Sequence, residues 1–216
     1  MNDQQTPAPL TDPAAFWEDR YHGQGQRWSG RANAALVREV DGLDPGSALD
    51  LGSGEGGDAI WLAENGWSVT AVDIAPSALA LAARNAEVAG VGSRIRWVQA
   101  DLAGWRPEGA FDLVSAQFLH SPVELPRDVI LRRAASAVAP GGLFVVVGHG
   151  DFPPWSSHPD DGTVLPTPGD VLTSLALPTE AWTVVTCALV DRDGTGPDGT
   201  TATLVDSVLT LRRRRR

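Results

Sequence analysis

Three acidic residues lie at the ends of short apolar runs, and a cluster of glycines follows the first run. Asp50 directly precedes Leu51 and the sequence GSGEGG at residues 52–57, Asp73 closes the second run, and Asp101 follows the third. Glycines at such a turn let the main chain approach a ligand closely. A carboxylate at the end of the next strand can accept hydrogen bonds from both hydroxyls of a ribose. These residues therefore predict a nucleoside-binding site.

The charge around the glycine turn indicates which nucleoside would bind. Residues 52–57 also fit the dinucleotide pattern G-x-G-x-x-G. However, Asp50 would repel a pyrophosphate and would attract an ammonium or sulfonium group, and Asp101 adds a third carboxylate. We therefore predict a positively charged adenosine derivative. A dinucleotide, as in a nicotinamide-dependent oxidoreductase, is the weaker alternative, and glycines that served helix packing alone would not account for Asp73.

Two histidines are candidates for proton transfer. His120 follows a fourth apolar run, and His149, with Asp151 close behind, follows a fifth. Open α/β sheets bind ligands at the carboxyl ends of their strands, and histidine is the side chain best suited to accept a proton near neutral pH. The alternative is that His120 begins the following helix. The four histidines do not have metal-ligand spacing, so no metal site is predicted.

Alternating strand and helix patterns would position these groups. Strands are predicted at 48–51, 67–72, 95–99, 111–116 and 143–147, and helices at 13–22, 33–40, 58–65, 76–89 and 123–138. A proline-rich loop at 151–169, a short helix at 170–175 and a hairpin of strands 182–190 and 200–211, joined by 193–199, complete the chain. Right-handed crossovers then make a doubly wound parallel α/β sheet.

Motifs in this order over residues 33–211 resemble those of the class I S-adenosylmethionine-dependent methyltransferases. They are DLGSGEG at 50–56, AVDI at 71–74, QADL at 99–102 and FDLV at 111–114. The resemblance implies methyl transfer from S-adenosylmethionine, in a Rossmann-like sheet of seven mostly parallel strands with a C-terminal antiparallel hairpin strand. It also implies which residues bind the cofactor. The methionine part would face Asp50, Gly52, Ser53 and Gly54, and the ribose would face Asp73. The adenine would contact Ile74, Asp101 and Leu102, and Gln117 would line the pocket.

The N-terminal segments 16–21 (FWEDRY) and 28–30 (WSG) resemble the lid of small-molecule methyltransferases of the tellurite-resistance and thiopurine types. This resemblance makes Trp28 and Tyr21 pocket candidates. The alternative, preferred for Phe16 and Trp17, is that the aromatic side chains bury their helix against the sheet. The expected organisation is a tail and lid at 1–30, a methyltransferase domain at 31–211 and an arginine tail at 212–216.

The acceptor is predicted to be a small molecule. Residues 115–122 lack the Asn/Asp-Pro-Pro-Tyr signature of enzymes that methylate DNA bases or glutamine amides. The net charge of −10, despite five terminal arginines, disfavours nucleic acids and anionic membranes as partners. An oxygen, nitrogen, sulfur or chalcogen-oxyanion acceptor stays open, as does the oligomeric state. A non-catalytic protein that binds S-adenosylmethionine is a further alternative.

Composition excludes some chemistry and sets further expectations. All 17 basic residues are arginine, so no lysine Schiff base or P-loop lysine is available. Cys187 is the only cysteine, which excludes an internal disulfide, and its apolar surroundings predict a buried side chain. No apolar run approaches the ~20 residues of a membrane span, and a cytoplasmic protein is expected. The arginine tail is expected to be a solvated chain end rather than a tether for nucleic acid or lipid.

Overall fold

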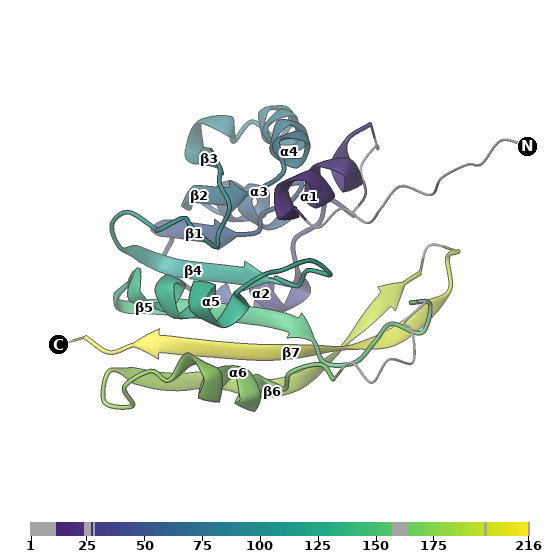
Figure 1. Cartoon of the computed structure of the whole chain (residues 1–216). Coiled ribbons are helices and arrows are strands. Elements are labelled where there is room, and N and C mark those ends of the chain that lie inside the picture. Colours follow the sequence, from purple (N-terminus) through teal and green to yellow (C-terminus); the bar gives the residue numbers. More distant parts are fainter. Residues whose placement is uncertain (1–11, 24–26, 28, 157–163, 197, 216) are drawn as a thin grey trace, which may run out of the picture.

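The computed structural model describes residues 12–23, 27, 29–156, 164–196 and 198–215. Within them, seven strands form one sheet in the order β3-β2-β1-β4-β5-β7-β6 (Figure 1). The strands are β1 (Ser47–Leu51), β2 (Ser68–Asp73), β3 (Ile95–Gln99), β4 (Phe111–Gln117), β5 (Val138–His149), β6 (Trp182–Thr195) and β7 (Thr201–Arg213).

The first five strands are parallel, and β7 is antiparallel to both of its neighbours, β5 and β6. Strand order reverses at β1, which lies between β2 and β4. The carboxyl ends of β1, β2 and β4 therefore meet at one edge of the sheet, where doubly wound folds bind ligands. The predicted fold class, including the antiparallel C-terminal hairpin, is confirmed.

Helices cover both faces of this sheet. They are α1 (Pro13–Tyr21), α2 (Ala34–Val40), α3 (Gly57–Glu64), α4 (Pro76–Val88), α5 (Arg127–Ser136) and α6 (Pro168–Leu175), with a 3₁₀ turn at Gly92–Arg94. Buried side chains of α2, α3 and α4 pack on one face, and those of α5 and α6 pack on the other. The central strands β1, β4 and β5 are mostly buried and mainly apolar because both of their faces are covered.

The helix predicted at 123–138 is wrong at both ends. It begins at Arg127, because Pro126 disfavours helical geometry at the residue before it, and it ends at Ser136. The segment from Val138 through Gly142 belongs to β5, in which Val138 pairs with Phe111. A register shift between Phe111 and Leu113 accommodates this extension. The end of the expected helix is therefore strand because it pairs with β4. No local sequence pattern indicates this pairing.

The C-terminal hairpin is longer than predicted and extends past the ends of the parallel strands (Figure 1). Pairing of β6 with β7 continues to Thr195 and Thr201, so part of the expected turn is strand. The expectation of a solvated arginine tail is wrong for Arg212 and Arg213, which lie in β7. Arg212 Nη1 donates to the Gly141 carbonyl at 3.0 Å, which ties this end to β5.

The prediction that Cys187 is buried is also wrong, because its side chain is exposed. Cys187 lies on β6, which pairs with β7 alone and forms an edge of the sheet. Most β6 side chains are correspondingly exposed or only partly buried. The apolar composition of this run reflects strand propensity rather than a position in the core.

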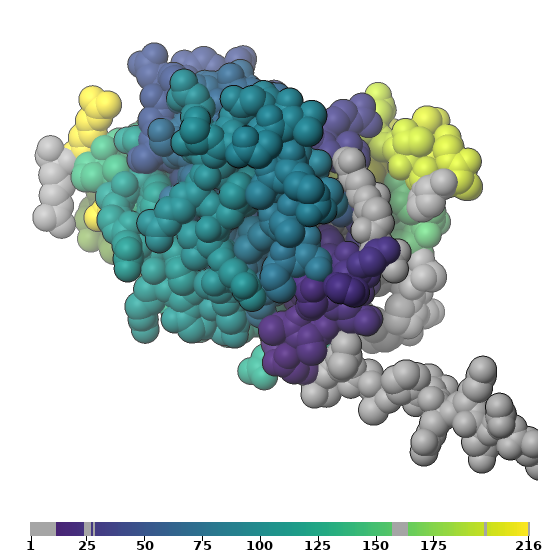
Figure 2. All heavy atoms as spheres, turned by 90° about the horizontal axis from the view of Figure 1, so that it is seen from above, coloured from purple at the N-terminus to yellow at the C-terminus, as the bar shows by residue number. Residues whose placement is uncertain are grey.

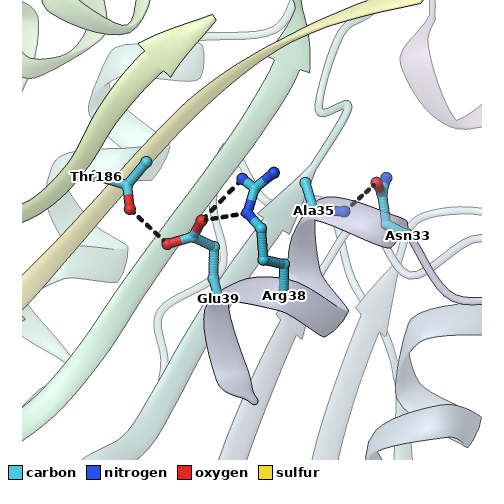
Figure 3. A network of polar contacts seen from close by, with 5 residues as sticks. All are labelled: Asn33, Ala35, Arg38, Glu39 and Thr186. Carbon is cyan, nitrogen blue, oxygen red and sulfur yellow. Dashed lines mark hydrogen bonds and ion pairs between the residues drawn. The ribbon is translucent and has the colours of Figure 1, made fainter. Parts of the chain in front are cut away.

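Polar contacts join α2 to the edge of the sheet (Figure 3). Asn33 caps α2 by accepting from the Ala35 amide at 3.4 Å, and Glu39 accepts from the Thr186 hydroxyl at 2.7 Å. Burial opposes ionisation of Glu39, but hydrogen bonds from Thr186 and Arg38 outweigh it and lower the pKa of Glu39. The charged carboxylate therefore links α2 to β6 across the intervening strands.

In the described part of the chain, no helix has the length and apolarity that a membrane span requires.

Candidate functional site

The glycine turn after β1 is held in a conformation that its sequence makes possible. Gly52, Gly54 and Gly56 have positive φ angles of 71°, 52° and 83°. The amides of Gly52 and Ser53 both donate to the Val72 carbonyl, at 2.8 and 3.0 Å, so the turn is joined to β2. Only glycine adopts such angles without strain. The turn thus places its main chain at the sheet edge where strand order reverses.

Asp73 joins the end of β2 to this turn. Its carboxylate accepts from the Gly54 amide at 2.7 Å and from the Ala75 amide at 2.9 Å. Burial raises the pKa of Asp73, and the backbone hydrogen bonds oppose the rise. The side chain is 8% exposed. A carboxylate has about four acceptor sites, so Asp73 can accept further hydrogen bonds beyond those from the main chain.

Three further buried polar atoms near this edge have no hydrogen-bond partner among the described residues. They are Asp50 Oδ2 at the end of β1, Ser53 Oγ in the turn and Gln117 Oε1 at the end of β4. Buried polar groups are normally paired. The set offers two acceptors and a hydroxyl, and Asp50 in addition can carry negative charge. These atoms fit the ammonium and sulfonium groups of the S-adenosylmethionine implied by the sequence.

Asp50 belongs to a group of carboxyls with Asp73, which is also buried, and Asp58, which is partly buried. Burial, followed by repulsion from Asp58 and Asp73, raises the pKa of Asp50 well above its ordinary value. Burial raises the pKa of Asp58 to about 6, although Asp58 also accepts from the Asn33 amide at 2.6 Å. A cation bound beside Asp50 would favour its ionised form and release a proton.

We therefore expect the affinity for S-adenosylmethionine to fall as the pH is lowered through the range in which Asp50, with its raised pKa, and Asp58, with a pKa of about 6, become protonated, because protonated carboxyls attract the cation less. Isothermal titration calorimetry between pH 8 and pH 5 measures this change. S-adenosylhomocysteine, which lacks the sulfonium charge, is the matched control and should lose less affinity. Equal pH dependence of the two ligands, or unchanged pH dependence in Asp50→Asn, would contradict the expectation.

The predicted adenine contacts have mixed surroundings. Leu102 is buried, Ile74 is partly buried, and Asp101 is exposed. The Asp101 carboxylate accepts from the Ala103 amide at 2.8 Å and stabilises the turn that follows β3. Their roles in binding adenine stay predictions.

Helix α1 lies beside α4 (Figures 1 and 2). A Cβ built at Gly54 would lie 3.3 Å from the Tyr21 hydroxyl. The Arg27 amide donates to Glu55 Oε1 at 2.7 Å. Phe16 and Trp17 are partly buried, and α1 packs beside α4, so the expected burial of these two side chains is only partial. Trp28 lies outside the described residues.

Glu18 of α1 supplies a contact that was not predicted. It accepts from the Ser77 amide at 3.0 Å and from the Ser77 hydroxyl at 2.5 Å, at the first turn of α4. The N-cap of α4 is Ala75, which has no side-chain acceptor, so Glu18 provides one from another helix. One indication of this contact is present in the sequence: the N-cap position of α4 is alanine, so the acceptor for the first turn of α4 has to come from elsewhere. This contact holds α1 against α4 beside Asp73.

The two histidines come together beyond β4 and β5. Their rings are 5.7 Å apart and nearly parallel, and the ring of Phe118 is 4.5 Å from that of His149. His120 Nε2 is buried without a hydrogen-bond partner among the described residues. Burial, Arg127 and His149 lower the pKa of His120 to about 4, so the ring is uncharged at neutral pH. The alternative that His120 begins a helix is wrong, since α5 begins at Arg127.

Three charged residues beside the histidines were missed in the sequence. Asp206 of β7 pairs in register with His149 and accepts from Arg192 Nε at 2.7 Å. Arg127 Nε donates to the Leu119 carbonyl at 3.1 Å. Arg192 and Asp206 come from the C-terminal hairpin, far from His120 and His149 in the chain, whereas Arg127 lies at the start of α5, shortly after His120. No local motif marks any of the three.

Residues 48–142 match a protein family described as a methyltransferase domain. A demethylmenaquinone methyltransferase of Thermus thermophilus is 36% identical over 135 residues, which are 61% of this chain and 57% of that protein. A 2-heptyl-1-hydroxyquinolin-4(1H)-one methyltransferase of Mycobacteroides abscessus is 30% identical over 64% of this chain and 66% of its own length. The chain thus spans less than two thirds of either curated relative.

Two solved structures share the fold over most of the chain. The N-methyltransferase NodS of Bradyrhizobium japonicum, in complex with S-adenosyl-L-homocysteine, has a TM-score of 0.65 at 18% identity and covers 94% of this chain and 99% of its own. TehB of Haemophilus influenzae has a TM-score of 0.63 at 16% identity, covering 94% of this chain and 67% of its own. At these identities the likeness is one of fold.

Proposed function

We propose that this chain, whose residues 48–142 match a methyltransferase domain, is a class I S-adenosylmethionine-dependent methyltransferase that transfers the methyl group to a small-molecule acceptor. Residues 31–211 would form the catalytic domain, and the segment before them would close over the cofactor. Asp73 would hold the ribose and Asp50 the charged methionine part. His120 and His149 would face the acceptor.

The observation that best supports this proposal is the buried, unpaired Asp50 Oδ2 beside the glycine turn. An unsatisfied buried carboxyl destabilises the free protein, whereas a bound sulfonium or ammonium group would stabilise it. A pyrophosphate would instead add repulsion at the same place. This difference favours S-adenosylmethionine over a nicotinamide dinucleotide.

Binding of S-adenosylhomocysteine is the first test. At a concentration about 100-fold above the dissociation constant, a ligand adds about 2.7 kcal/mol of stability, which for a chain of this size raises the melting temperature by roughly 5–10 °C. We expect this shift with S-adenosylhomocysteine and none with NADH. A shift with NADH alone would indicate the oxidoreductase, and no shift with either ligand would contradict the proposal.

Turnover separates an enzyme from a protein that merely binds the cofactor. Release of S-adenosylhomocysteine in the presence of thiol, hydroxyl and amine acceptors measures it. Methyl transfer in these reactions is an in-line displacement, to which positioning and exclusion of water contribute strongly. Tight cofactor binding without turnover of any acceptor would favour the non-catalytic alternative.

A small-molecule acceptor is preferred over a macromolecular one. A curated relative in Alcanivorax borkumensis is named a ribosomal RNA small subunit methyltransferase, so RNA is a reasonable competing substrate. The net charge of −10 opposes binding to a phosphate backbone. Methylation of ribosomal RNA at a rate above that of small acceptors would overturn this choice.

A further inference from the structure

The carboxyl ends of β4 and β5 carry a different charge from the cofactor side of the site. A Cβ built at Gly148 would lie 3.0 Å from His120 Nε2 and 4.0 Å from Arg127 Nη2. The two side chains therefore border the same point of the main chain near the end of β5. His149 follows Gly148 directly, and its ring faces that of His120. The carboxylate placed beside this group among the described residues is that of Asp206, which pairs in register with His149 rather than with His120 or Arg127.

Arg127 is a cation without a counter-charge at ion-pair distance in the described part of the chain. It is half-buried, and burial lowers its pKa while neighbouring Asp128 opposes that change. A guanidinium nevertheless stays protonated at physiological pH. Arg127 is also the first residue of α5, where the helix dipole disfavours positive charge. A partly desolvated cation in this position is destabilising, and an anion beside it would offset that cost.

The neighbouring residues do not supply that anion. His120 is uncharged at neutral pH, with a pKa lowered to about 4 by burial, Arg127 and His149. Asp206 lies across from His149; its Oδ2 is paired with Arg192, and its Oδ1 has no hydrogen-bond partner among the described residues. The charge at Arg127 itself is therefore positive and has no partner at ion-pair distance in the described part of the chain, in contrast to the carboxyls Asp50, Asp58 and Asp73 on the cofactor side. An ammonium group would be repelled here and an anion attracted.

We propose that the acceptor presents an acidic thiol or hydroxyl group, which reacts as a thiolate or an aryl or enol oxyanion beside Arg127, rather than an amine. The inference rests on the proposed methyl transfer and specifies its substrate class. The acceptor loses its proton to solvent, and a lone pair of the resulting anion forms a bond to the methyl carbon. The carbon–sulfur bond of the sulfonium breaks, and its electron pair stays on sulfur. An anion and a cation thus become a neutral thioether or ether and neutral S-adenosylhomocysteine sulfur.

Benzenethiol and aniline are matched probes, because they share one ring and differ in the acceptor atom. Methylated products are measured by mass spectrometry with S-adenosylmethionine, and rates without protein are subtracted. We expect methylation of benzenethiol, with a kcat/KM that Arg127→Gln lowers by about 10- to 100-fold, the effect of losing one charge-assisted hydrogen bond. In Arg127→Gln the ratio of kcat/KM for benzenethiol to kcat/KM for aniline should also fall. Arg127→Lys should restore part of this ratio.

Arg132→Gln is the matched control, because it removes the same charge from the exposed side of α5, where Arg132 Nε contacts the Ser174 carbonyl. It should leave the ratio unchanged. Binding of S-adenosylhomocysteine should be equal in the natural protein and in all variants, and absence of binding by the natural protein would indicate failure of the proposed function instead. An unchanged ratio in Arg127→Gln, a preference of the natural protein for aniline, or methylation of neither probe by protein that binds the cofactor would overturn the inference.

Discussion

Asp73→Ala is expected to weaken the binding of S-adenosylhomocysteine by about 100-fold or more. Two charge-assisted hydrogen bonds to ribose hydroxyls, at roughly 1.5–3 kcal/mol each, account for a change of this size. The substitution also removes the acceptor of the Gly54 and Ala75 amides, so the glycine turn keeps only its main-chain bonds to Val72 of β2. Isothermal titration calorimetry measures the dissociation constant.

Glu64→Ala is the control for Asp73→Ala, because Glu64 is an exposed carboxylate on α3 and should leave the dissociation constant unchanged. Asp73→Asn preserves the side-chain shape and addresses the possibility that the alanine variant folds poorly. Its NH₂ group cannot accept from a main-chain amide or a ribose hydroxyl, so weaker binding is again expected. A folded variant at position 73 with undiminished affinity would remove the ribose contact from the proposed site.

Gly56→Ala is expected to reduce the free energy of unfolding by about 2–4 kcal/mol. Gly56 has a φ of 83°, a conformation that costs an L-residue roughly 1–2 kcal/mol. An added Cβ would also lie 2.7 Å from the ring of Trp97 and 2.9 Å from the Ala82 Cβ, and overpacking of this kind costs about 1–3 kcal/mol. Urea unfolding followed by circular dichroism measures the change.

Gly90→Ala separates the two contributions. Gly90 also has a positive φ, of 74°, but a Cβ there meets nothing within 4 Å. It should show the backbone cost alone. Equal destabilisation by the two substitutions would mean that Trp97 and Ala82 move to accommodate the added Cβ. Close packing would then not be the reason for glycine at position 56. Because Gly56 precedes α3, the more damaging variant should also lose affinity for S-adenosylhomocysteine.

The parts of the cofactor side that could be predicted are those encoded in short segments. Asp50, the glycines of 52–57 and Asp73 lie within or beside single strand ends, where alternation of apolar residues and glycine punctuation are visible. The structure brings Asp50 and Asp73 together at the turn, as expected from parallel pairing of β1 with β2. Asp101 also lies at a strand end, but its exposed carboxylate is engaged with the following turn.

The acceptor side could be predicted only in part. His120 and His149 were visible as residues at strand ends, whereas Arg127, Arg192 and Asp206 were not. Arg127 was expected inside a helix, and its place beside His120 depends on where α5 begins. Asp206 faces His149 because β7 is antiparallel to β5 in a register that no local pattern encodes.

Local sequence was enough to establish the order of strands and helices, the glycine turn and the acidic strand ends, because periodicity and backbone constraints act over a few residues. Long-range pairing set the rest. It extended β5 through 138–142, left Cys187 exposed on an edge strand and brought charges from α5 and the hairpin to the two histidines. These outcomes depend on which segments come into contact, and that choice minimises the free energy of the whole chain rather than of any one segment.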